Sequence, residues 1–404
     1  MHIAYVLTCL EEHRGGVPRS TQGLANAVAK QGPSISFWSV ASGNDRDALR
    51  ETKLDSHVFE PAWPRGWFRS PGFSKVLRRH AEETDLFHIQ ELWAYPEVAA
   101  AKVANRTDTP YIIVPRGVLE PWRIRQKGYL KYLKKTAFLN LLGRSILDNS
   151  ACLHAITPGE VDGFRQVGYQ GPITVVPNGV DARVCDLSRD PSEAEECWPV
   201  LRNRRVVLFL SRLDTEKGLD QLLPAWVKLK ERKGYEDALL VLAGPDYAGY
   251  QSKIDALIDQ YDLESSILIT GMVKGREKEA LIARSDIYTL PSYSEGFSMS
   301  ILENMAAGKP VLITPGCHFP EAVEAGAGIC VEPESGQIEE GLKYLLDLSS
   351  EDHERMGMAG KKLVRENYTW DIAARKMITV YRCILEGKEI PLHPEPAVAE
   401  GNDL

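Results

Sequence analysis

Short runs that are apolar almost throughout recur along the chain, and most are followed by a stretch whose apolar positions have helical spacing. Runs of this kind are typical of parallel strands that are buried on both faces of a sheet. The pattern therefore predicts an α/β protein with helices on both sides of its sheets. The predicted strands cover residues 3–7, 34–40, 85–89, 111–114, 152–156 and 174–176 in a first series, and 205–210, 239–243, 267–270, 287–290, 311–313 and 329–331 in a second.

The two series of strands predict two domains, because 404 residues are too many for one ordinary core. Pro177-Asn178-Gly179 is a turn signal, and residues 182–204 are polar and irregular. We therefore expect a first domain at 1–181, a linker at 182–204 and a second domain at 205–369. The tail at 387–404 is rich in proline and acids, and we expect it to be disordered.

The composition narrows the functional classes. A formal net charge of -8 disfavours nucleic acid as a partner. The seven cysteines are scattered without any metal-ligand spacing, which favours a reducing cytoplasm. The start of the chain resembles a first strand and not a signal peptide. No apolar run approaches the roughly 20 residues that span a bilayer, so any membrane contact is expected to be peripheral.

The stretch from Pro291 to Val311 holds the most informative chemistry. Glu295 lies in the loop after a predicted strand, and Glu303 lies inside a predicted helix over 298–307. The amides of Gly296, Phe297 and Ser298 would point out of the helix N-terminus, which attracts phosphate and other anions. Carboxylates accept hydrogen bonds from sugar and ribose hydroxyls. Together these groups suit a nucleotide sugar.

The spacing of Glu295 and Glu303 resembles the E-x7-E motif of retaining glycosyltransferase family 4, which has the GT-B fold. Further segments resemble the family in the same order, and one near Arg116 resembles its subset with Pro-Arg-Gly-x-Leu. These further segments are Gly15-Gly16, 175–181, 211–218 and 243–245. The resemblance implies two Rossmann-like domains whose parallel sheets face across a cleft. The first would bind the acceptor and be completed by a C-terminal helix at 370–386, and the second would bind the donor.

The resemblance also implies the reaction. A sugar would pass, with retention, from a nucleotide diphosphate sugar to a saccharide or lipid-linked saccharide acceptor, in cell-surface polysaccharide or glycan biosynthesis. The leaving phosphate would take the acceptor proton, so no protein base is required. No metal or other cofactor is expected. Asp45-Arg46-Asp47 has the D-x-D form of a metal motif but follows no predicted strand, and we interpret it as solvated surface.

The roles of individual residues follow from the same resemblance. Arg212 and Lys217 would hold the donor diphosphate, since a guanidinium fork and a point charge both suit phosphate. Glu303 would bind the ribose hydroxyls, and Glu295 would lie beside the donor sugar with the amides of residues 296–298. Gly16 would let the backbone of the first domain approach the diphosphate.

One departure from the family concerns the residue nearest the reacting carbon. Many members have a His-Gly pair where this chain has Arg116-Gly117. Arg116 stays protonated and cannot act as a general base. It is therefore a candidate for binding the donor phosphate or an acidic acceptor, or for a structural ion pair. His88 is interpreted as a strand-end residue facing the cleft, with either a catalytic or a packing role.

The segment 122–144 contains lysines and arginines but no acid. Arg123, Lys127, Lys131 and Lys134 follow helical spacing on one face, and a second, apolar face contains Leu133 and Leu141. A basic amphipathic helix can bind an anionic membrane surface. The alternative is a helix whose apolar face packs on the core and whose basic face is solvated.

Two other functions remain open at this stage. A nucleotide-sugar epimerase on the same fold would need a set of acids and histidines that the sequence does not display. A non-catalytic nucleotide-sugar binding protein would bind the donor without transfer or hydrolysis. The candidate residues Arg212, Lys217, Glu295 and Glu303 favour the transferase.

Overall fold

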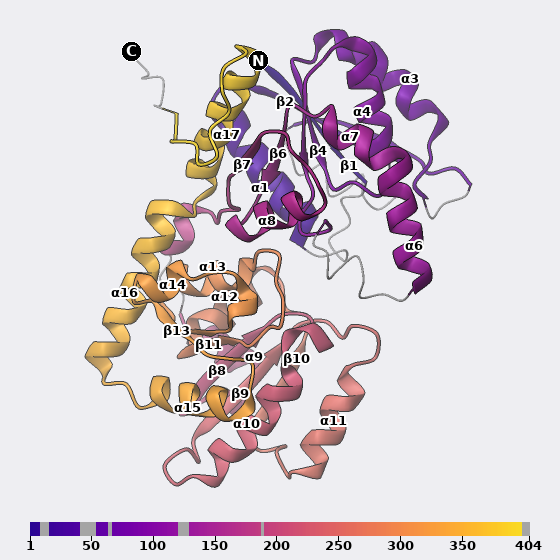
Figure 1. Cartoon of the computed structure of the whole chain (residues 1–404). Coiled ribbons are helices and arrows are strands. Elements are labelled where there is room, and N and C mark those ends of the chain that lie inside the picture. The colour runs from indigo at the N-terminus through magenta and orange to yellow at the C-terminus, as the bar shows by residue number, and fades with distance from the viewer. Residues whose placement is uncertain (9–15, 41–53, 64–66, 120–128, 187–189, 398–404) are drawn as a thin grey trace, which may run out of the picture. The chain divides into compact units, whose positions relative to one another are not determined.

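The structure is a computed structural model that describes residues 1–8, 16–40, 54–63, 67–119, 129–186 and 190–397. It divides into two compact units (Figure 1). Unit 1 comprises Met1–Gly179 and Trp370–Leu404, and unit 2 comprises Val180–Thr369. The chain thus leaves unit 1 near residue 180 and returns to it at residue 370. Among the described residues, no helix is both long enough and apolar enough to cross a bilayer.

Unit 1 contains a parallel sheet of seven strands in the order β3-β2-β1-β4-β5-β6-β7. Six of the strands were predicted from their apolar runs. Strand β3 was not, because it lies at the sheet edge, where none of its residues is fully buried, and its first three residues are polar. The strands are β1 (His2–Leu7), β2 (Ser34–Val40), β3 (Asp55–Phe59), β4 (Leu86–Gln90), β5 (Tyr111–Val114), β6 (Cys152–Ala155) and β7 (Ile173–Val175).

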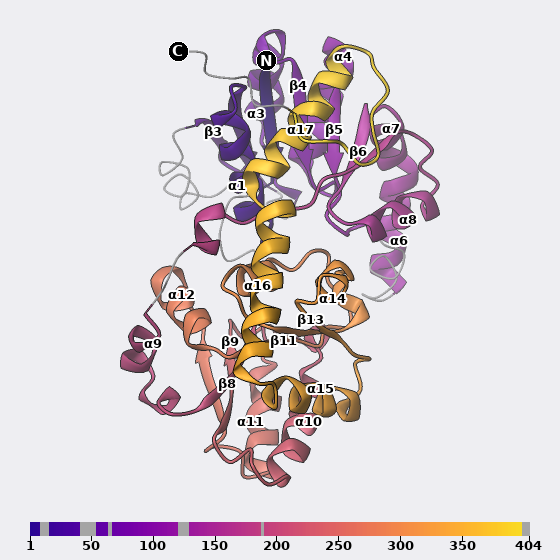
Figure 2. The ribbon, with the colours of Figure 1, turned by 90° about the vertical axis from the view of Figure 1, so that its left-hand side faces the viewer.

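Helices cover both faces of this sheet. Alternate residues of β1 point to opposite faces, so Ile3 and Tyr5 join one apolar cluster and Ala4 and Val6 the other. On the first face α1 packs against α17, where a Cβ on Gly23 would lie 2.4 Å from the ring of Trp370 (Figure 2). The helices are α1 (Gly16–Lys30), α3 (Pro71–His80), α4 (Tyr95–Thr107), α6 (Tyr129–Phe138), α7 (Arg144–Asp148), α8 (Pro158–Gln166) and α17 (Trp370–Leu385).

The expectation of a disordered tail from residue 387 is wrong as far as residue 397. The amide of Val175, in the edge strand β7, donates a 2.7 Å hydrogen bond to the carbonyl of Leu392. The side chains of Ile390 and Ala397 pack against the apolar cluster that contains α17. The tail is therefore held by an otherwise unpaired strand edge, a partner that its own composition does not reveal. Residues 398–404 lie outside the described residues.

Unit 2 contains a second parallel sheet of six strands, in the order β10-β9-β8-β11-β12-β13. Its core is one apolar cluster built from the strands and the helices on both faces. The strands are β8 (Arg205–Leu210), β9 (Ala238–Ala243), β10 (Ile267–Gly271), β11 (Ile287–Leu290), β12 (Val311–Ile313) and β13 (Gly328–Cys330). The helices are α9 (Ser192–Cys197), α10 (Leu219–Glu231), α11 (Gln251–Gln260), α12 (Gly275–Arg284), α13 (Met299–Ala306), α14 (Glu321–Glu324), α15 (Ser335–Leu346) and α16 (Ser350–Asn367).

The expected linker at 182–204 is not an irregular connection. It contains 3-10 turns at Ala182–Cys185 and Pro199–Leu201 in addition to α9. The side chains of Cys185, Ala194 and Leu201 are buried in the core of unit 2. These single apolar residues are too widely spaced to form a recognisable pattern, which is why the sequence suggested a polar linker.

The two sheets share one topological feature, and the prediction of two parallel-sheet α/β units is confirmed. In each sheet the chain moves outward from its first strand and then starts again on the other side of that strand. The switch points lie between β1 and β4 in unit 1 and between β8 and β11 in unit 2. In open α/β sheets, ligands bind outside the carboxyl ends of the strands at such points.

Candidate active site

The loops that leave β8 and β11 are joined to each other at the switch point of unit 2. The carbonyl of Glu216 accepts hydrogen bonds from the amide of Tyr293 and the hydroxyl of Ser292, both at 2.9 Å. Gly218 has φ +71°, and a Cβ there would lie 1.9 Å from the carbonyl oxygen of Pro291. Only glycine allows this close approach of the two loops. The approach brings the predicted groups of both loops together.

Lys217 and Glu295 form an ion pair across these two loops. The Lys217 Nζ lies 2.7 Å from Glu295 Oε1, and the two side chains are only 7% and 11% exposed. The amide of Glu295 is held in turn by the carbonyl of Gly316, at 2.7 Å. A buried ion pair contributes little net stability in general, so its presence at a switch point marks a candidate site.

Arg212 lies at the carboxyl end of β8 with its guanidinium accessible. The side chain is 43% exposed, and its guanidinium carbon lies 4.8 Å from the centre of the Tyr247 ring. Its Nη2 lies 3.9 Å from Oδ2 of Asp214. A guanidinium that stacks on an aromatic face keeps the N–H groups at its edge available for an anion. Arg212 is thus the more open of the two predicted diphosphate ligands.

Helix α13 follows β11 and holds the second acid of the motif. Gly296, Phe297 and Ser298 are half-buried and directly precede it, and no other atom lies within 4 Å of a Cβ placed on Gly296. Glu303 pairs with Lys278 of α12, with 2.6 Å between Lys278 Nζ and Glu303 Oε1. Sequence reasoning missed Lys278, because nothing in its local sequence distinguishes it from a surface lysine.

Unit 1 also gathers polar groups at its switch point, but around a buried arginine. The Arg116 guanidinium donates to Gln90 Oε1 at 2.7 Å, to Ser20 Oγ at 2.8 Å and to Thr21 Oγ1 at 3.1 Å. Burial lowers the pKa of Arg116 to about 10. These contacts fasten the first turns of α1 to the ends of β4 and β5. Near the start of this helix, no other atom lies within 4 Å of a Cβ placed on Gly16.

A buried acid, Glu97 of α4, lies near the carboxyl end of β1. Its two carboxyl oxygens accept from the hydroxyl of Thr8, at the end of β1, and from the amide of Ala94 at 3.0 Å. Burial and then the nearby Glu91 raise the pKa of Glu97 to about 8, so the carboxyl group is mostly neutral at pH 7. Sequence reasoning missed this residue as well, because an acid in the first turn of a helix is ordinary.

Two family models match the chain in succession. The glycosyl transferase 4-like domain matches residues 15–179, and the glycosyl transferases group 1 model matches residues 195–363. The first match lies in unit 1 and the second in unit 2, and together they cover most of the chain. The chain belongs to the GT-B glycosyltransferases.

Curated relatives of this glycosyltransferase are similar over part of their length. An uncharacterized glycosyltransferase of Methanocaldococcus jannaschii is 28% identical over 222 residues, which are 53% of this chain and 55% of that protein. The D-inositol 3-phosphate glycosyltransferase of Corynebacterium diphtheriae is 26% identical over 251 residues, 59% of this chain and 57% of that protein. The chain thus matches little more than half the length of these relatives.

Solved structures align with nearly the full length of this chain. HepE of Anabaena, in complex with UDP and glucose, aligns over 94% of this chain and 98% of its own, with a TM-score of 0.75 and 19% identity. A glycosyltransferase from Rickettsia africae aligns over 96% and 99%, with a TM-score of 0.76 and 20% identity. At these identities the likeness shows the fold alone.

The structure corrects the interpretation of His88 in this glycosyltransferase. His88 lies in the middle of β4, not at its end, and its side chain is fully buried. Its Nδ1 bonds with the hydroxyl of Tyr381 in α17 at 2.7 Å, and Tyr5 bonds with the same hydroxyl at 2.8 Å. Burial lowers the pKa of His88 well below its ordinary value, so the ring is neutral. These contacts assign His88 to the packing of α17 on the sheet.

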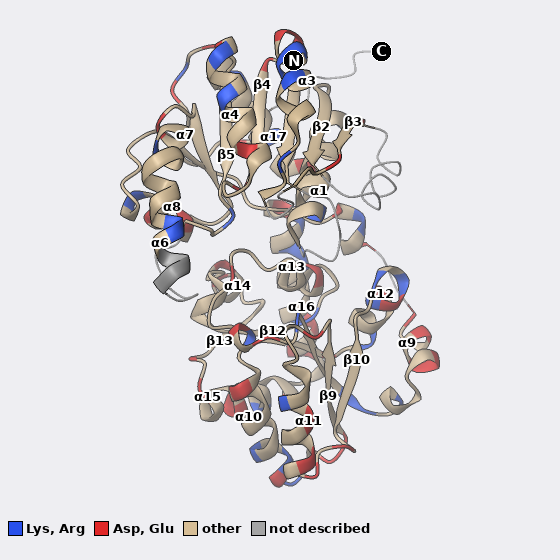
Figure 3. Ribbon diagram, turned by 90° about the vertical axis from the view of Figure 1, so that its right-hand side faces the viewer, with Lys and Arg blue, Asp and Glu red and all other residues tan. Residues whose placement is uncertain are grey.

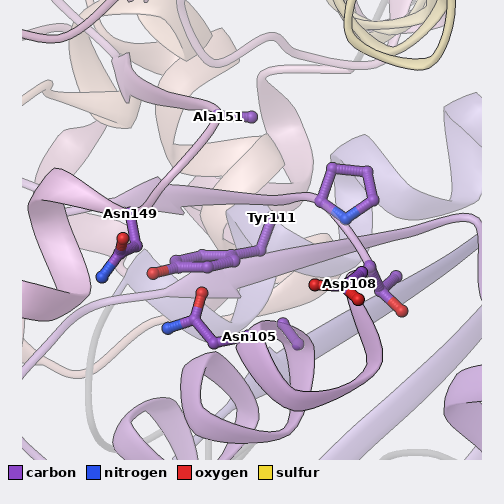
Figure 4. Close-up of a pocket in the computed structure, with 8 residues that line it drawn as sticks. Asn105, Asp108, Tyr111, Asn149 and Ala151 are labelled. Atoms are coloured by element: carbon purple, nitrogen blue, oxygen red, sulfur yellow. The ribbon is translucent and has the colours of Figure 1, made fainter.

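A pocket in unit 1 lies at the wrong edge of the sheet to extend the candidate site (Figure 4). Its residues come before or at the start of β5 and β6, which is the amino end of the strands. They include Asn105, Asp108, Tyr111 and Asn149. The polar groups at the switch points lie at the carboxyl ends of the strands instead.

The D-x-D segment at 45–47, which we interpreted as solvated surface, lies outside the described residues.

Proposed function

We propose that this glycosyltransferase moves a sugar from a nucleotide diphosphate sugar to a saccharide or lipid-linked saccharide acceptor. The observation that carries the proposal is the group of Arg212, Lys217 and Glu295 at the switch point of unit 2. Two cations and one acid within joined loops suit a substrate that carries a diphosphate on one side and sugar hydroxyls on the other. Unit 1 would supply the acceptor side.

Within this proposal the residues of unit 2 have separate roles. Arg212 and Lys217 bind the diphosphate, assisted by the backbone amides of residues 296–298 before α13. Glu295 orients Lys217 and accepts hydrogen bonds from the donor sugar. Glu303 accepts hydrogen bonds from the ribose, and Lys278 holds its carboxylate in place.

The reaction proceeds with retention and without a metal. The bond between the anomeric carbon and the leaving phosphate oxygen breaks, and a bond from the same carbon to the acceptor oxygen forms on the same face. The acceptor proton passes to the leaving phosphate oxygen, so no protein base takes part. Lys217 and Arg212 stabilise the charge that develops on the diphosphate, as a divalent cation does in other enzymes. Arg116 is a positioning residue that holds α1 and Gly16 at the switch point of unit 1.

The names of the relatives support a place in glycan biosynthesis. They include an O-antigen chain mannosyltransferase of Escherichia coli and a GDP-mannose-dependent phosphatidylinositol dimannoside mannosyltransferase of Mycobacterium tuberculosis. We infer that this protein acts in the cytoplasm, peripherally on the inner face of the cell membrane. The base and sugar of the donor are the first properties to determine.

A thermal-shift panel of UDP-, GDP- and ADP-sugars tests donor binding, because a ligand that binds only the folded state raises Tm. One base should stabilise the protein more than the others. The preferred donor is then incubated with acceptor mixtures, with and without EDTA, and the products are analysed by NMR. Transfer that survives EDTA and gives the donor's own anomeric configuration is expected. Epimerised donor without acceptor would favour the epimerase, and binding without any turnover would favour a binding protein.

A further inference from the structure

The loops that leave β8 and β9 run side by side past the ends of the two strands. The loop after β9 contains Tyr247 and joins that strand to α11 (Figure 3). The amide of Leu213 donates to the carbonyl of Pro245 at 3.0 Å, and the amide of Tyr247 donates to the carbonyl of Leu213 at 3.1 Å. Gly244 has φ +151°, and a Cβ there would lie 1.8 Å from the carbonyl oxygen of Ser211. The two loops are therefore held together on both sides of residue 212.

This backbone arrangement places an aromatic face against the more open cation of the candidate site. The guanidinium carbon of Arg212 lies 4.8 Å from the centre of the Tyr247 ring. The side chain of Arg212 is 43% exposed, and Tyr247 is 45% exposed. Burial alone therefore fixes neither side chain, and the contact between them restricts where the guanidinium can lie.

The acid next to this arginine is already engaged by its own turn. Asp214 Oδ1 accepts hydrogen bonds from the hydroxyl of Thr215 at 3.1 Å and from the amide of Glu216 at 3.5 Å, at the start of the 3-10 turn Thr215–Lys217. Its Oδ2 lies 3.9 Å from Arg212 Nη2, which is too long for a hydrogen bond. The ring covers a face of the guanidinium, so the N–H groups at its edge stay available to an anion.

The two cations of the candidate site are thus held in different ways. Lys217 pairs with the buried carboxylate of Glu295, which a diphosphate would have to replace. Arg212 stacks on a neutral ring, which a diphosphate can leave in place. An exposed arginine loses rotamer freedom when it binds a ligand, and a ring that already restricts the side chain lowers that cost.

We propose that Tyr247 is a positioning residue for the donor, whose ring holds the Arg212 guanidinium in the orientation that receives the diphosphate. The inference rests on the proposed function, because it needs a diphosphate at Arg212. Tyr247 acts through Arg212 and not on the ligand itself. The aromatic face supplies the effect, so a phenylalanine ring should serve as well as that of tyrosine.

Calorimetric titration of full-chain variants tests this assignment. UDP, GDP and ADP are titrated into wild type, and the diphosphate that binds most tightly becomes the probe, beside its own nucleoside. Tyr247→Leu should weaken binding of the diphosphate about two- to fivefold, because it keeps an apolar side chain but removes the aromatic face. Tyr247→Phe should bind like wild type, and neither variant should change binding of the nucleoside.

A double-mutant cycle separates positioning from direct contact. With Arg212→Ala in place, Tyr247→Leu should no longer change the affinity for the diphosphate, because the side chain that Tyr247 orients is gone. Tyr261→Leu replaces a tyrosine at the opposite end of α11 that is 43% exposed, and this matched control should bind like wild type. All these variants change exposed side chains, so their Tm should stay within a degree or so of wild type.

The possible outcomes distinguish this inference from the proposed function. Wild type that binds none of the three diphosphates would contradict the proposed function, and the role of Tyr247 with it. Wild type that binds one of them, with Tyr247→Leu binding equally tightly, would overturn only the role of Tyr247. So would an equal loss for the nucleoside, a loss in Tyr247→Phe, or a loss that persists beside Arg212→Ala, because each would mean that Tyr247 acts on the ligand and not through Arg212.

Discussion

The switch points of the two units occupy the same place in similar sheets, yet they use their charges differently. At β8 and β11 the cations Arg212 and Lys217 lie near the acids Asp214 and Glu295, and Arg212 is 43% exposed. At the switch point between β1 and β4 the cation Arg116 is buried. Its N–H groups donate hydrogen bonds to Gln90, Ser20 and Thr21. The acid Glu97, which accepts a hydrogen bond from Thr8 at the end of β1, is buried as well.

The contrast suggests that the charged groups of unit 2 bind a ligand, whereas those of unit 1 hold structural elements in position. In the function proposed above, the cations of unit 2 exchange their present partners for a diphosphate. In unit 1 the hydrogen bonds of Arg116 join three elements, and a ligand would have to break them to reach the guanidinium. Position at a switch point therefore suggests where a ligand binds, but the partners of each side chain decide whether that side chain is available to it.

The largest effect is expected from the neutral acid of unit 1. The pKa of Glu97 is about 8 when folded and ordinarily 4.5, so its contribution to stability is complete below about pH 4.5 and is lost as the pH rises through 8. The free energy of unfolding should fall by up to about 1.4 kcal/mol per pH unit in this window. Glu97→Gln stays neutral, and urea unfolding at several pH values should show a flatter profile. An unchanged slope would mean that Glu97 is ionised in the folded protein.

Arg116→Ala should lower the free energy of unfolding by about 3 kcal/mol, because it leaves three buried polar groups without their charged partner. The affinity for the nucleotide diphosphate should not change. Urea unfolding and titration with the preferred nucleotide, far below the unfolding midpoint, measure the two quantities. Arg116→Lys keeps the charge but not the fork, and should lie between wild type and alanine in stability. Weaker nucleotide binding at unchanged stability would make Arg116 a ligand and remove the contrast between the units.

Lys217→Ala should weaken binding of the nucleotide diphosphate about ten- to a hundred-fold, since it removes a charge-assisted contact. Arg212→Ala should weaken binding of the nucleotide diphosphate about tenfold, because that side chain is half-exposed and its charge is better screened by solvent. Binding of the free nucleoside should change far less in both. Calorimetric titration provides these constants, and Lys228→Ala, on the exposed side of α10, is the control. Equal losses for nucleoside and diphosphate would place the two cations outside the diphosphate site.

The smallest effect is expected at Glu295 and Glu303, the two acids of the E-x7-E motif in unit 2. Glu303→Gln should weaken the nucleotide about fivefold, near 1 kcal/mol, through lost hydrogen bonds to the ribose. Lys278→Ala should act in the same direction, because Lys278 orients that carboxylate. Glu295→Gln should lower kcat and leave nucleotide affinity near that of wild type. If Glu295→Gln costs more affinity than Glu303→Gln, the two roles are exchanged.

Much of the fold was predictable because a strand buried on both faces must be apolar throughout. The bounds of β5, β8, β11 and β12 agree with the predicted runs at 111–114, 205–210, 287–290 and 311–313, and the C-terminal helix expected at 370–386 spans Trp370–Leu385. Strand β3 was not predicted, because an edge strand is only half-buried and therefore lacks a continuous apolar run. The ordered part of the tail was not predicted either, because Leu392 is held by Val175, more than two hundred residues away in the chain.

The sequence by itself determined the parallel α/β architecture, the family and the residues that lie at the strand ends. It could not decide which of these residues are free to bind. Arg116 and Arg212 are the same residue type after comparable strands, and only the tertiary structure shows that one is saturated by neighbours and the other open. The same holds for Lys278 and Glu97, whose partners come from other elements, and for Leu133 and Leu141, which are exposed. Apolar patterning is a local property, whereas burial, pairing and pKa depend on what distant segments bring to each side chain.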